Sequence, residues 1–449
     1  MKHIALAVAL AVAAAAHAQP IATKRSLIVT DPLILEVGGF TLKRVFAQLR
    51  EQGKSPRSSL AFWQQWWDTQ QEGPGLRPAN FHCDDEQSPE GAPAMNGFPI
   101  MCPRAEAEEI AQNPFLDGNP GSYHATALVN RFDLAPVDGG NCGEYRIVFA
   151  KKSEFGERNF LIFEAVMPNP TPAKKLAGCR PIAEFWAGLS EIEGPGRRAQ
   201  ELKRFYFEGL FLGKLRLPPV IHVEHYGRLG GQIRTNQFMQ SPWLLKQFEL
   251  AQQCTERSGR CQIQFMPVVT ENTPFGALFN DLSGLEQVPN FQKNFVQYIA
   301  GLLPNDVNQM SLPDAHEFAA GESHSQDLIG DYAFQFEQGT GEFANAIRMA
   351  LKTLGSNLEP IHVVRRALFL SCGGCHQQSA FFPNDDLGNG VSAPSSLGFL
   401  HVDESGNLSS ALQEVFLPHR KRVLEDFLQG TPVPEAAAGM TIGGPRRPH

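Results

Sequence analysis

Six of the eight cysteines constrain the fold of this 449-residue chain most strongly, because paired cysteines fix which distant segments lie together. Six cysteines allow many pairings, and short loops favour three of them: Cys83–Cys102, Cys142–Cys179 and Cys254–Cys261. The last pair flanks TERSGR, which has the composition of a hairpin end. The even count of these six leaves Cys372 and Cys375 available for another role.

The first 18 residues, MKHIALAVALAVAAAAHA, have the layout of a secretory signal peptide. Lys2 gives a positive start, an apolar stretch follows, and Ala16-His17-Ala18 is a small-x-small cleavage site. No later stretch approaches the roughly 18 unbroken apolar residues that a membrane-spanning helix needs. We therefore expect a periplasmic or secreted protein, in a compartment where disulfides form. The formal net charge of −8 argues against nucleic acid as a partner.

Apolar periodicity predicts an α+β domain over residues 19–290, whose role the sequence does not indicate. Its expected helices are 41–52, 59–70, 181–190 and 197–211. Its expected strands are 124–134, 144–152, 159–168, 232–239, 243–250 and 261–269. The first three strands should form an antiparallel meander and the last two a hairpin. Residues 72–104, rich in Gly, Pro and Asn, should form a loop closed by Cys83 and Cys102.

The pattern then changes to a mainly helical region over residues 291–430. Its expected helices are 291–303, 341–354, 359–370 and 410–428. Residues 431–449 lack apolar periodicity, and we expect this tail to be disordered. The predicted fold class is therefore α+β, with a disulfide-supported antiparallel N-terminal region followed by a helical C-terminal region.

The stretch LFLSCGGCHQQSAFF contains Cys372-Gly-Gly-Cys375-His376. On a helical turn, two thiols at this spacing can reach both vinyl groups of one porphyrin, and the next residue can bind its iron. This C-x-x-C-H sequence resembles the haem-attachment site of c-type cytochromes. The resemblance implies covalent haem c, thioethers from Cys372 and Cys375, iron binding by His376, and a cytochrome c-like fold for the helical region.

The second iron ligand is expected on the C-terminal side of the motif, where small cytochromes often have a methionine. Met440 is the only downstream methionine, and it lies in the tail. His401, in LGFLHVDE, is our leading distal candidate because apolar residues lead up to it. A purely structural histidine is the alternative. His419 is expected on a polar helix face, and His362 could also face the porphyrin.

Other interpretations of the motif stay open. A redox dithiol usually opens a helix in a thioredoxin-like unit, and no βαβ pattern surrounds residue 372. A zinc site needs a second cysteine pair at suitable spacing. A plain disulfide is the remaining possibility. Upstream, ALVNRFDLAPVDGGNCGEYRIVF and FLIFEAVMPNP resemble uncharacterised exported bacterial proteins, which transfer no activity.

The sequence thus predicts an exported monohaem c-type protein that transfers electrons to or from an unknown redox partner. One alternative is a haem enzyme, peroxidase- or oxygenase-like, with an open sixth position on the iron. The other is a non-redox exported binding protein in which the two motif cysteines form a disulfide.

Overall fold

The computed structural model describes residues 20–74, 81–116, 121–151, 157–212, 215–254, 261–313, 315–380 and 385–431. The expected signal peptide and all but the first residue of the expected disordered tail fall outside these ranges. The side chains of Cys254 and Cys261 also lie outside what is described, although their backbones pair across a hairpin. The third expected disulfide therefore remains a prediction.

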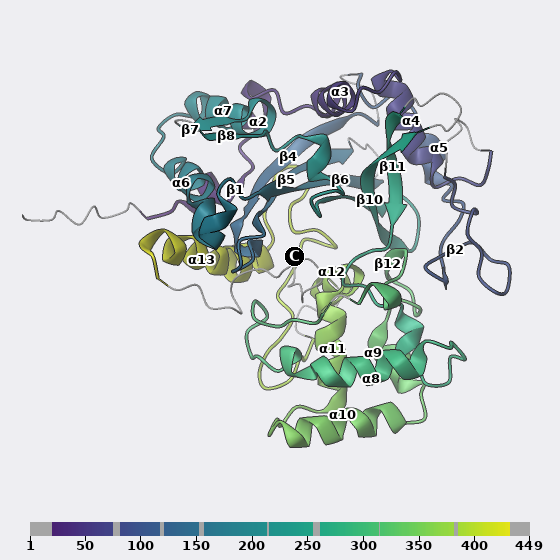
Figure 1. Ribbon diagram of the computed structural model, residues 1–449. Helices are drawn as coiled ribbons and strands as arrows, with labels where there is room; N and C mark the ends of the chain where they lie inside the picture. The colour runs from purple at the N-terminus through teal and green to yellow at the C-terminus, as the bar shows by residue number, and fades with distance from the viewer. Residues whose placement is uncertain are drawn as a thin grey trace, which may run out of the picture.

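An antiparallel sheet lies at the centre of the molecule, and within the described ranges it has eight strands (Figure 1). Its order is β1-β4-β5-β6-β9-β10-β11, and β12 pairs with β10. The strands are β1 (Ile28–Val29), β4 (Tyr123–Arg131), β5 (Asn141–Lys151), β6 (Arg158–Pro168), β9 (Gln232–Phe238), β10 (Trp243–Cys254), β11 (Cys261–Val268) and β12 (Glu322–Ser325). The expected meander and hairpin are confirmed. Neither β1 nor β12 was expected from the sequence.

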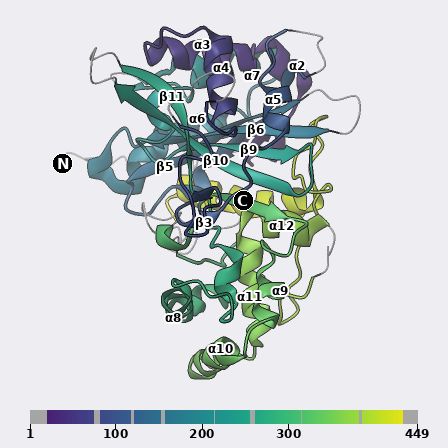
Figure 2. The same ribbon diagram turned by 90° about the vertical axis from the view of Figure 1, so that its right-hand side faces the viewer.

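Helices from the N-terminal half cover the upper face of the sheet in Figures 1 and 2. They are α2 (Pro32–Val37), α3 (Leu42–Gln52), α4 (Ser59–Asp68), α5 (Glu106–Ile110), α6 (Arg180–Gly188) and α7 (Pro195–Lys203), after a short α1 (Thr23–Ser26). Ser58 begins α4 by accepting a hydrogen bond from the Ala61 amide. Trp66 of α4 then stacks on Phe265 of β11, with ring centres 4.3 Å apart. The tryptophan-rich helix is thus a core element.

The helix expected over 197–211 is partly wrong. Its α-helical part ends at Lys203, and residues 204–208 form a π-helical turn. The chain then enters the small ribbon of β7 (Leu210–Leu212) and β8 (Leu215–Leu217). Gly209 makes this exit possible because its φ of +85° is a conformation that side chains disfavour. A second small ribbon, β2 (Ala94–Met95) with β3 (Phe98–Pro99), lies in the loop closed by Cys83 and Cys102.

A group of helices from the C-terminal half lies below the sheet in Figure 1. It comprises α8 (Val288–Tyr298), α9 (Tyr332–Glu337), α10 (Glu342–Thr353), α11 (Pro360–Leu370) and α12 (Cys372–Ala380). The last helix, α13 (Leu417–Gln429), follows a π-helical turn over 411–416 and packs against α6. One buried hydrophobic cluster includes residues from both the 19–290 and the 291–430 regions.

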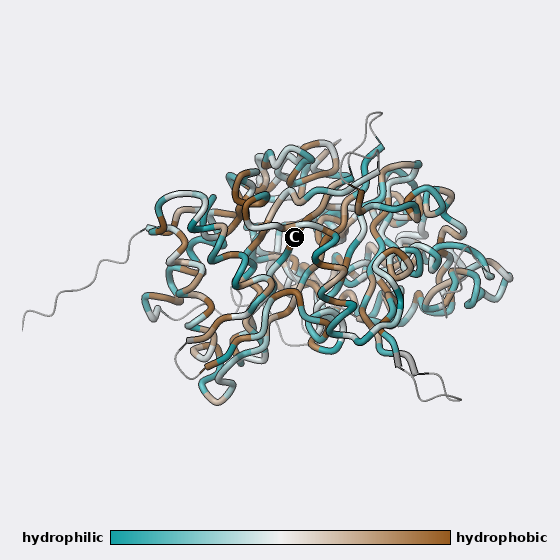
Figure 3. Tube along the Cα trace, turned by 90° about the horizontal axis from the view of Figure 1, so that it is seen from above, coloured by the Kyte–Doolittle hydropathy of each residue, from teal (hydrophilic) through white to brown (hydrophobic). Residues whose placement is uncertain are grey.

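Two disulfides support the fold, and both confirm expected pairs: Cys83–Cys102 and Cys142–Cys179. Such bonds are typical of proteins that fold in an oxidising compartment. Seen from above in Figure 3, hydrophobic segments are frequent through the middle of the trace and hydrophilic segments in its outer loops. Within the described ranges, no helix combines the length and the apolar character required to cross a bilayer.

The two faces of the sheet differ in chemistry, since successive side chains of a strand point to opposite faces. In β6, Leu161 and Phe163 alternate with Ile162 and Glu164. Phe163 packs edge-on against Trp66 of α4, so it belongs to the upper, apolar face. Glu164 therefore points to the lower face, where α12 and α13 lie. A charged residue inside the sheet marks this lower face as the place to look for a site.

Candidate functional site

The Cys-Gly-Gly-Cys-His motif forms the beginning of α12, directly after α11. Ser371 caps this helix: its Oγ atom accepts a hydrogen bond from the Gly374 amide at 3.0 Å. The Gly373 amide donates to Ser323 Oγ of β12 at 2.8 Å. The start of α12 is thereby attached to the sheet through β12, which pairs with β10.

Both motif cysteines are buried and, unlike the two bridged pairs, form no disulfide. Cys372 packs with Trp243, Leu245 and Phe399. Burial raises the pKa of Cys375 to about 12, and the neighbouring Cys372 adds to this. Burial also raises the pKa of Cys372, although Arg234 opposes it. The thiols are therefore protonated near neutral pH, whereas a reactive dithiol needs a thiolate.

His376 and His401 lie next to each other, with ring centres 5.2 Å apart and ring planes 41° from parallel. The structure thus brings His401 to the motif from 25 residues further along the chain. The His401 Nε2 atom is 3.9 Å from Cys375 Sγ, and its Nδ1 atom is 3.0 Å from Ser409 Oγ. The His376 ring centre also lies 5.0 Å from that of Trp243.

Burial keeps both imidazoles neutral. It lowers the pKa of His376 to about 4, and it lowers the pKa of His401 well below the ordinary value, with His376 and Arg420 adding to the effect. The Nδ1 atom of His376 is buried and has no hydrogen-bond partner among the described residues. A neutral imidazole has a lone pair for a metal ion.

The other histidines considered from the sequence lie elsewhere. His362 accepts a hydrogen bond from the Glu359 amide at 3.2 Å, so it contributes to the N-terminal cap of α11. His419 is only 9% exposed, which corrects the expectation of a polar helix face. It is buried because α13 packs against both α6 and the 3₁₀ turn after β4. Met440 lies outside the described residues.

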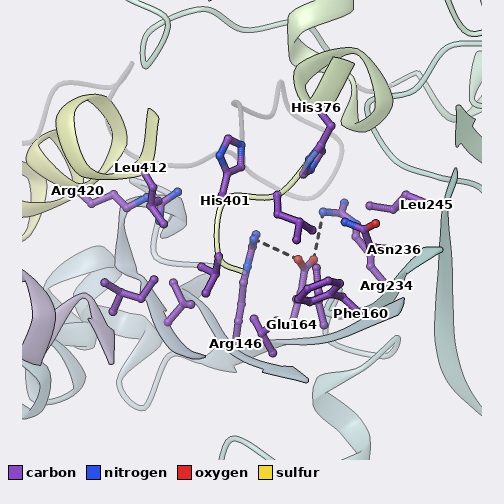
Figure 4. A pocket seen from close by; sticks show the side chains of 16 residues that line it. Arg146, Phe160, Glu164, Arg234, Asn236, Leu245, His376, His401, Leu412 and Arg420 are labelled. Carbon is purple, nitrogen blue, oxygen red and sulfur yellow. Dashed lines mark ion pairs between the residues drawn. The ribbon is translucent and has the colours of Figure 1, made fainter. Parts of the chain in front are cut away.

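A cavity of about 110 Å³ opens beside the two histidines, between the lower face of the sheet and the segments around His401 and α13 (Figure 4). Its walls are mostly apolar, from Ile28, Val129, Val148, Phe160, Ile162, Leu245, Leu400, Val402 and Leu412. Its polar lining comprises Arg146, Glu164, Arg234, Asn236, Arg420, His376 and His401. The whole lining comes from six strands (β1, β4, β5, β6, β9 and β10), α12, α13 and the chain between the two helices.

Glu164 holds two of the arginines in place, as the dashed lines of Figure 4 show. Its Oε1 atom is 3.2 Å from Arg146 Nη1, and its Oε2 atom is 3.2 Å from Arg234 Nη1. Burial alone would lower the pKa values of both guanidinium groups, but the nearby carboxylates outweigh burial and raise them. The floor of the cavity therefore carries fixed charges.

The strands that carry these charges were expected from the sequence, but the charged residues themselves were not identified as site residues. The available signal was an ionisable residue inside an otherwise apolar strand: Arg146 in EYRIVF, Glu164 in LIFEAV and Arg234 in QIRTNQF. Buried charges are costly unless paired. A charge in each of three strands therefore indicates that the strands are neighbours, and β5-β6-β9 is the observed order.

Arg366 attaches the chain that follows the motif helix to α11. Its guanidinium is fully buried and donates to the carbonyl oxygens of Leu387 (2.6 Å), Leu302 (2.7 Å), Pro304 (3.0 Å) and Gly388 (3.1 Å). Two of these carbonyls belong to the segment that leads from α12 towards His401. Arg366 is a structural residue that keeps this segment in place.

A charged cluster fastens β12 on the other side of α12. His324 lies between Glu322 (Nε2–Oε1, 2.7 Å) and Asp327 (Nδ1–Oδ2, 2.5 Å), and Glu322 also pairs with Lys246 at 3.2 Å. Burial lowers the pKa of His324, but the two carboxylates outweigh it and raise this pKa to about 9. His324 is therefore charged at neutral pH.

No family model, curated protein or solved structure matches this chain. Among the described residues, no group of three or more His, Cys, Asp and Glu side chains is arranged to hold a metal ion. A haem iron needs only one or two protein ligands, because the porphyrin supplies the rest.

Proposed function

We propose that this chain is an exported monohaem c-type protein that transfers electrons. Cys372 and Cys375 would form the thioethers, His376 would bind the iron, and His401 would be the distal ligand. The observation that carries the proposal is the arrangement of the motif. Two buried cysteines that form no disulfide lie in the first turn of the helix that carries His376, and the neutral imidazoles of His376 and His401 line one cavity.

The residues present suit a haem chemically. The buried Nδ1 atom of His376 lacks a partner among the described residues, the thiols are unbridged, and most of the cavity wall is apolar. Metal–imidazole bonds are about 2 Å long, so two rings with centres 5.2 Å apart are near enough to serve one iron. The cavity is smaller than a porphyrin, so the segment around His401 would have to move outward to admit haem.

Each protein group has a defined task in this proposal. When bound, the haem would supply one-electron chemistry by cycling between ferric and ferrous iron. Trp243 and Cys372 lie in one apolar cluster, which would hold the imidazole of His376 in place and keep water away. Ser409, 3.0 Å from His401 Nδ1, would fix the orientation of the distal ring. Two histidine ligands favour a lower potential than a histidine–methionine pair.

The test is a reduced pyridine-haemochrome spectrum of protein expressed in a periplasm with a competent haem-maturation system. We expect the band of a haem with two thioethers, and we expect Cys372→Ala/Cys375→Ala to lose it. Cys83→Ala/Cys102→Ala is the matched control, because it also removes two cysteines but leaves the motif intact. A colourless wild type whose mass shows a further loss of two hydrogens, beyond those lost in the other disulfides, would instead favour the binding protein with a motif disulfide.

A haem enzyme is the second candidate, and the charged floor of the cavity favours it. Arg146 and Arg234 could hold a polar substrate on the side of the cavity where His401 lies. In that case His401 would act as a polar distal group without binding iron. Rapid binding of cyanide or carbon monoxide would support this function, whereas a six-coordinate spectrum that resists both would support electron transfer.

A further inference from the structure

Arg420 is a buried charge whose pairing is incomplete. Its side chain, on α13, is 5% exposed, and it lines the cavity together with Arg146 (Figure 4). The nearest carboxylate oxygen in the described part of the chain is Asp133 Oδ1, 4.0 Å from Arg420 Nε. That distance is too long for a hydrogen bond.

Asp133 is already engaged by another arginine. Arg131 Nε donates to Asp133 Oδ1 at 3.0 Å, and Arg131 Nη2 donates to Oδ2 at 2.9 Å. This is the bidentate geometry that satisfies a carboxylate best. Asp133 therefore neutralises Arg131 first and Arg420 only at longer range.

The other carboxylates near the cavity also pair with arginines other than Arg420. Glu144 Oε2 is 2.7 Å from Arg146 Nη2, and Glu164 is shared by Arg146 and Arg234. Among groups less than a tenth exposed, four arginines thus face three carboxylates: Arg131, Arg146, Arg234 and Arg420 against Asp133, Glu144 and Glu164. Glu271 lies 4.0 Å from Arg234 and is 22% exposed.

An unneutralised buried guanidinium costs several kcal/mol, so such a group normally has an anionic partner. We propose that Arg420 binds the carboxylate of an organic ligand inside this cavity. A carboxylate matches the planar fork of a guanidinium. The body of the ligand should be apolar, because Val129 and Leu412 belong to the same lining.

Two sources could supply this carboxylate: a propionate of the haem, or a free small organic acid. The first source rests on the proposed haem function, and the second does not. The volume of about 110 Å³ is below the roughly 150 Å³ of an enclosed cavity that takes up benzene. This cavity is partly open, however, so a single aromatic ring can enter with its far edge outside. Benzoate is therefore a suitable probe, and benzamide, which has the same shape without the charge, is its control.

The first experiment measures benzoate and benzamide binding by isothermal titration calorimetry, with thermal denaturation as a second readout. The proteins are the full-length wild type as expressed and full-length Cys372→Ala/Cys375→Ala, which cannot attach haem. The second protein has no thioether to haem, and it is used once its absorption spectrum shows that no haem is bound, so failure of the haem proposal leaves this test valid. We expect benzoate to bind more tightly than benzamide in at least one of the two proteins.

The second experiment replaces the cation. Arg420→Met should weaken benzoate binding by about 10- to 100-fold, the loss expected for a charge-assisted hydrogen bond. Arg420→Lys, which keeps the positive charge, should retain part of the affinity for benzoate. The ligand-free Arg420→Met protein should be at least as stable as wild type, because an incompletely paired buried charge is removed; a purely structural arginine would give the opposite result. Arg228→Met, at a 75% exposed side chain, is the control.

The outcomes separate the two sources. Selective benzoate binding to the haem-loaded wild type identifies a free acid. Selective binding only to the haem-free protein, with an altered reduction potential in haem-loaded Arg420→Met, identifies the propionate. Equal or absent binding of benzoate and benzamide in both proteins overturns the proposal, and this comparison holds even if Arg420→Met does not fold.

Discussion

Replacing Gly373, the first glycine between the two motif cysteines, by alanine tests how tightly the motif is held. An alanine inside a helix is normally about 1 kcal/mol more favourable than a glycine. Here the new Cβ would overlap the backbone carbonyl of His324, well inside the 3.0 Å limit for real Cβ contacts. That carbonyl belongs to β12, which is paired to the sheet and cannot yield as a flexible side chain would.

The two effects have opposite signs, and the overlap should prevail. Overpacking of a closed interior costs typically 1–3 kcal/mol, and more when backbone must move. After subtraction of the helix-propensity gain, we expect Gly373→Ala to lower the free energy of unfolding by about 1–2 kcal/mol. The displacement of α12 should also lower the amount of haem attached, since both cysteines and His376 move with the helix.

Urea unfolding followed by tryptophan fluorescence measures the first effect, because Trp66 and Trp243 are fully buried. The pyridine-haemochrome band per mole of protein measures the second. Gly188→Ala is the matched control: Gly188 ends α6, nothing lies within 4 Å of its added Cβ, and the change should be neutral or stabilising by up to about 1 kcal/mol. Equal stability of Gly373→Ala and wild type, with full haem attachment, would refute the reasoning.

Two further predictions concern the supports on either side of α12. Arg366→Met leaves four carbonyls without their donor and should lower the free energy of unfolding by about 3 kcal/mol or more. The control is Arg365→Met, at a 30% exposed side chain, which should lower the free energy of unfolding by under about 1 kcal/mol in the same urea experiment. His324 has its pKa raised from 6.5 to about 9, so its contribution is complete below pH 6.5 and disappears as pH rises through 9. Urea unfolding should show a loss of about 3 kcal/mol over this window. His324→Gln should abolish that slope, and a wild-type stability that is flat from pH 6.5 to 9 would contradict the assignment.

Local patterns were sufficient to predict most of the fold. The helix at 59–70 could be anticipated because Leu60, Trp63 and Trp67 recur at helical spacing, and the strands around Ile147 and Leu161 because they are apolar runs bounded by turns. The strand β12 could not be anticipated, because its sequence ESHS is polar and becomes a strand only through its pairing with β10. The paired cysteines were predictable because short loops are favoured, and two pairs are observed.

The candidate site was predictable only where its residues are adjacent in sequence. The motif could be recognised from the spacing of its cysteines and histidine. His401 became a candidate because apolar residues directly precede it. Arg420 is 19 residues beyond His401, in a helix whose sequence carries several other basic residues. Nothing local distinguishes it from its solvent-facing neighbours. Its burial depends on how α13 packs against distant parts of the chain, which is a tertiary effect.

The complete burial of the two motif thiols has a consequence for the biogenesis of the protein. If the chain carries the proposed haem, the porphyrin could not reach cysteines that are 0% and 1% exposed, so attachment would have to precede the closure of α12 onto the sheet. The cavity walls extend from Ile28 to Arg420, almost the whole length of the described chain. The pocket therefore does not exist until the last helix is in place. Haem attachment and final folding would have to occur as one ordered sequence, in which the cofactor is the template around which the end of the chain closes.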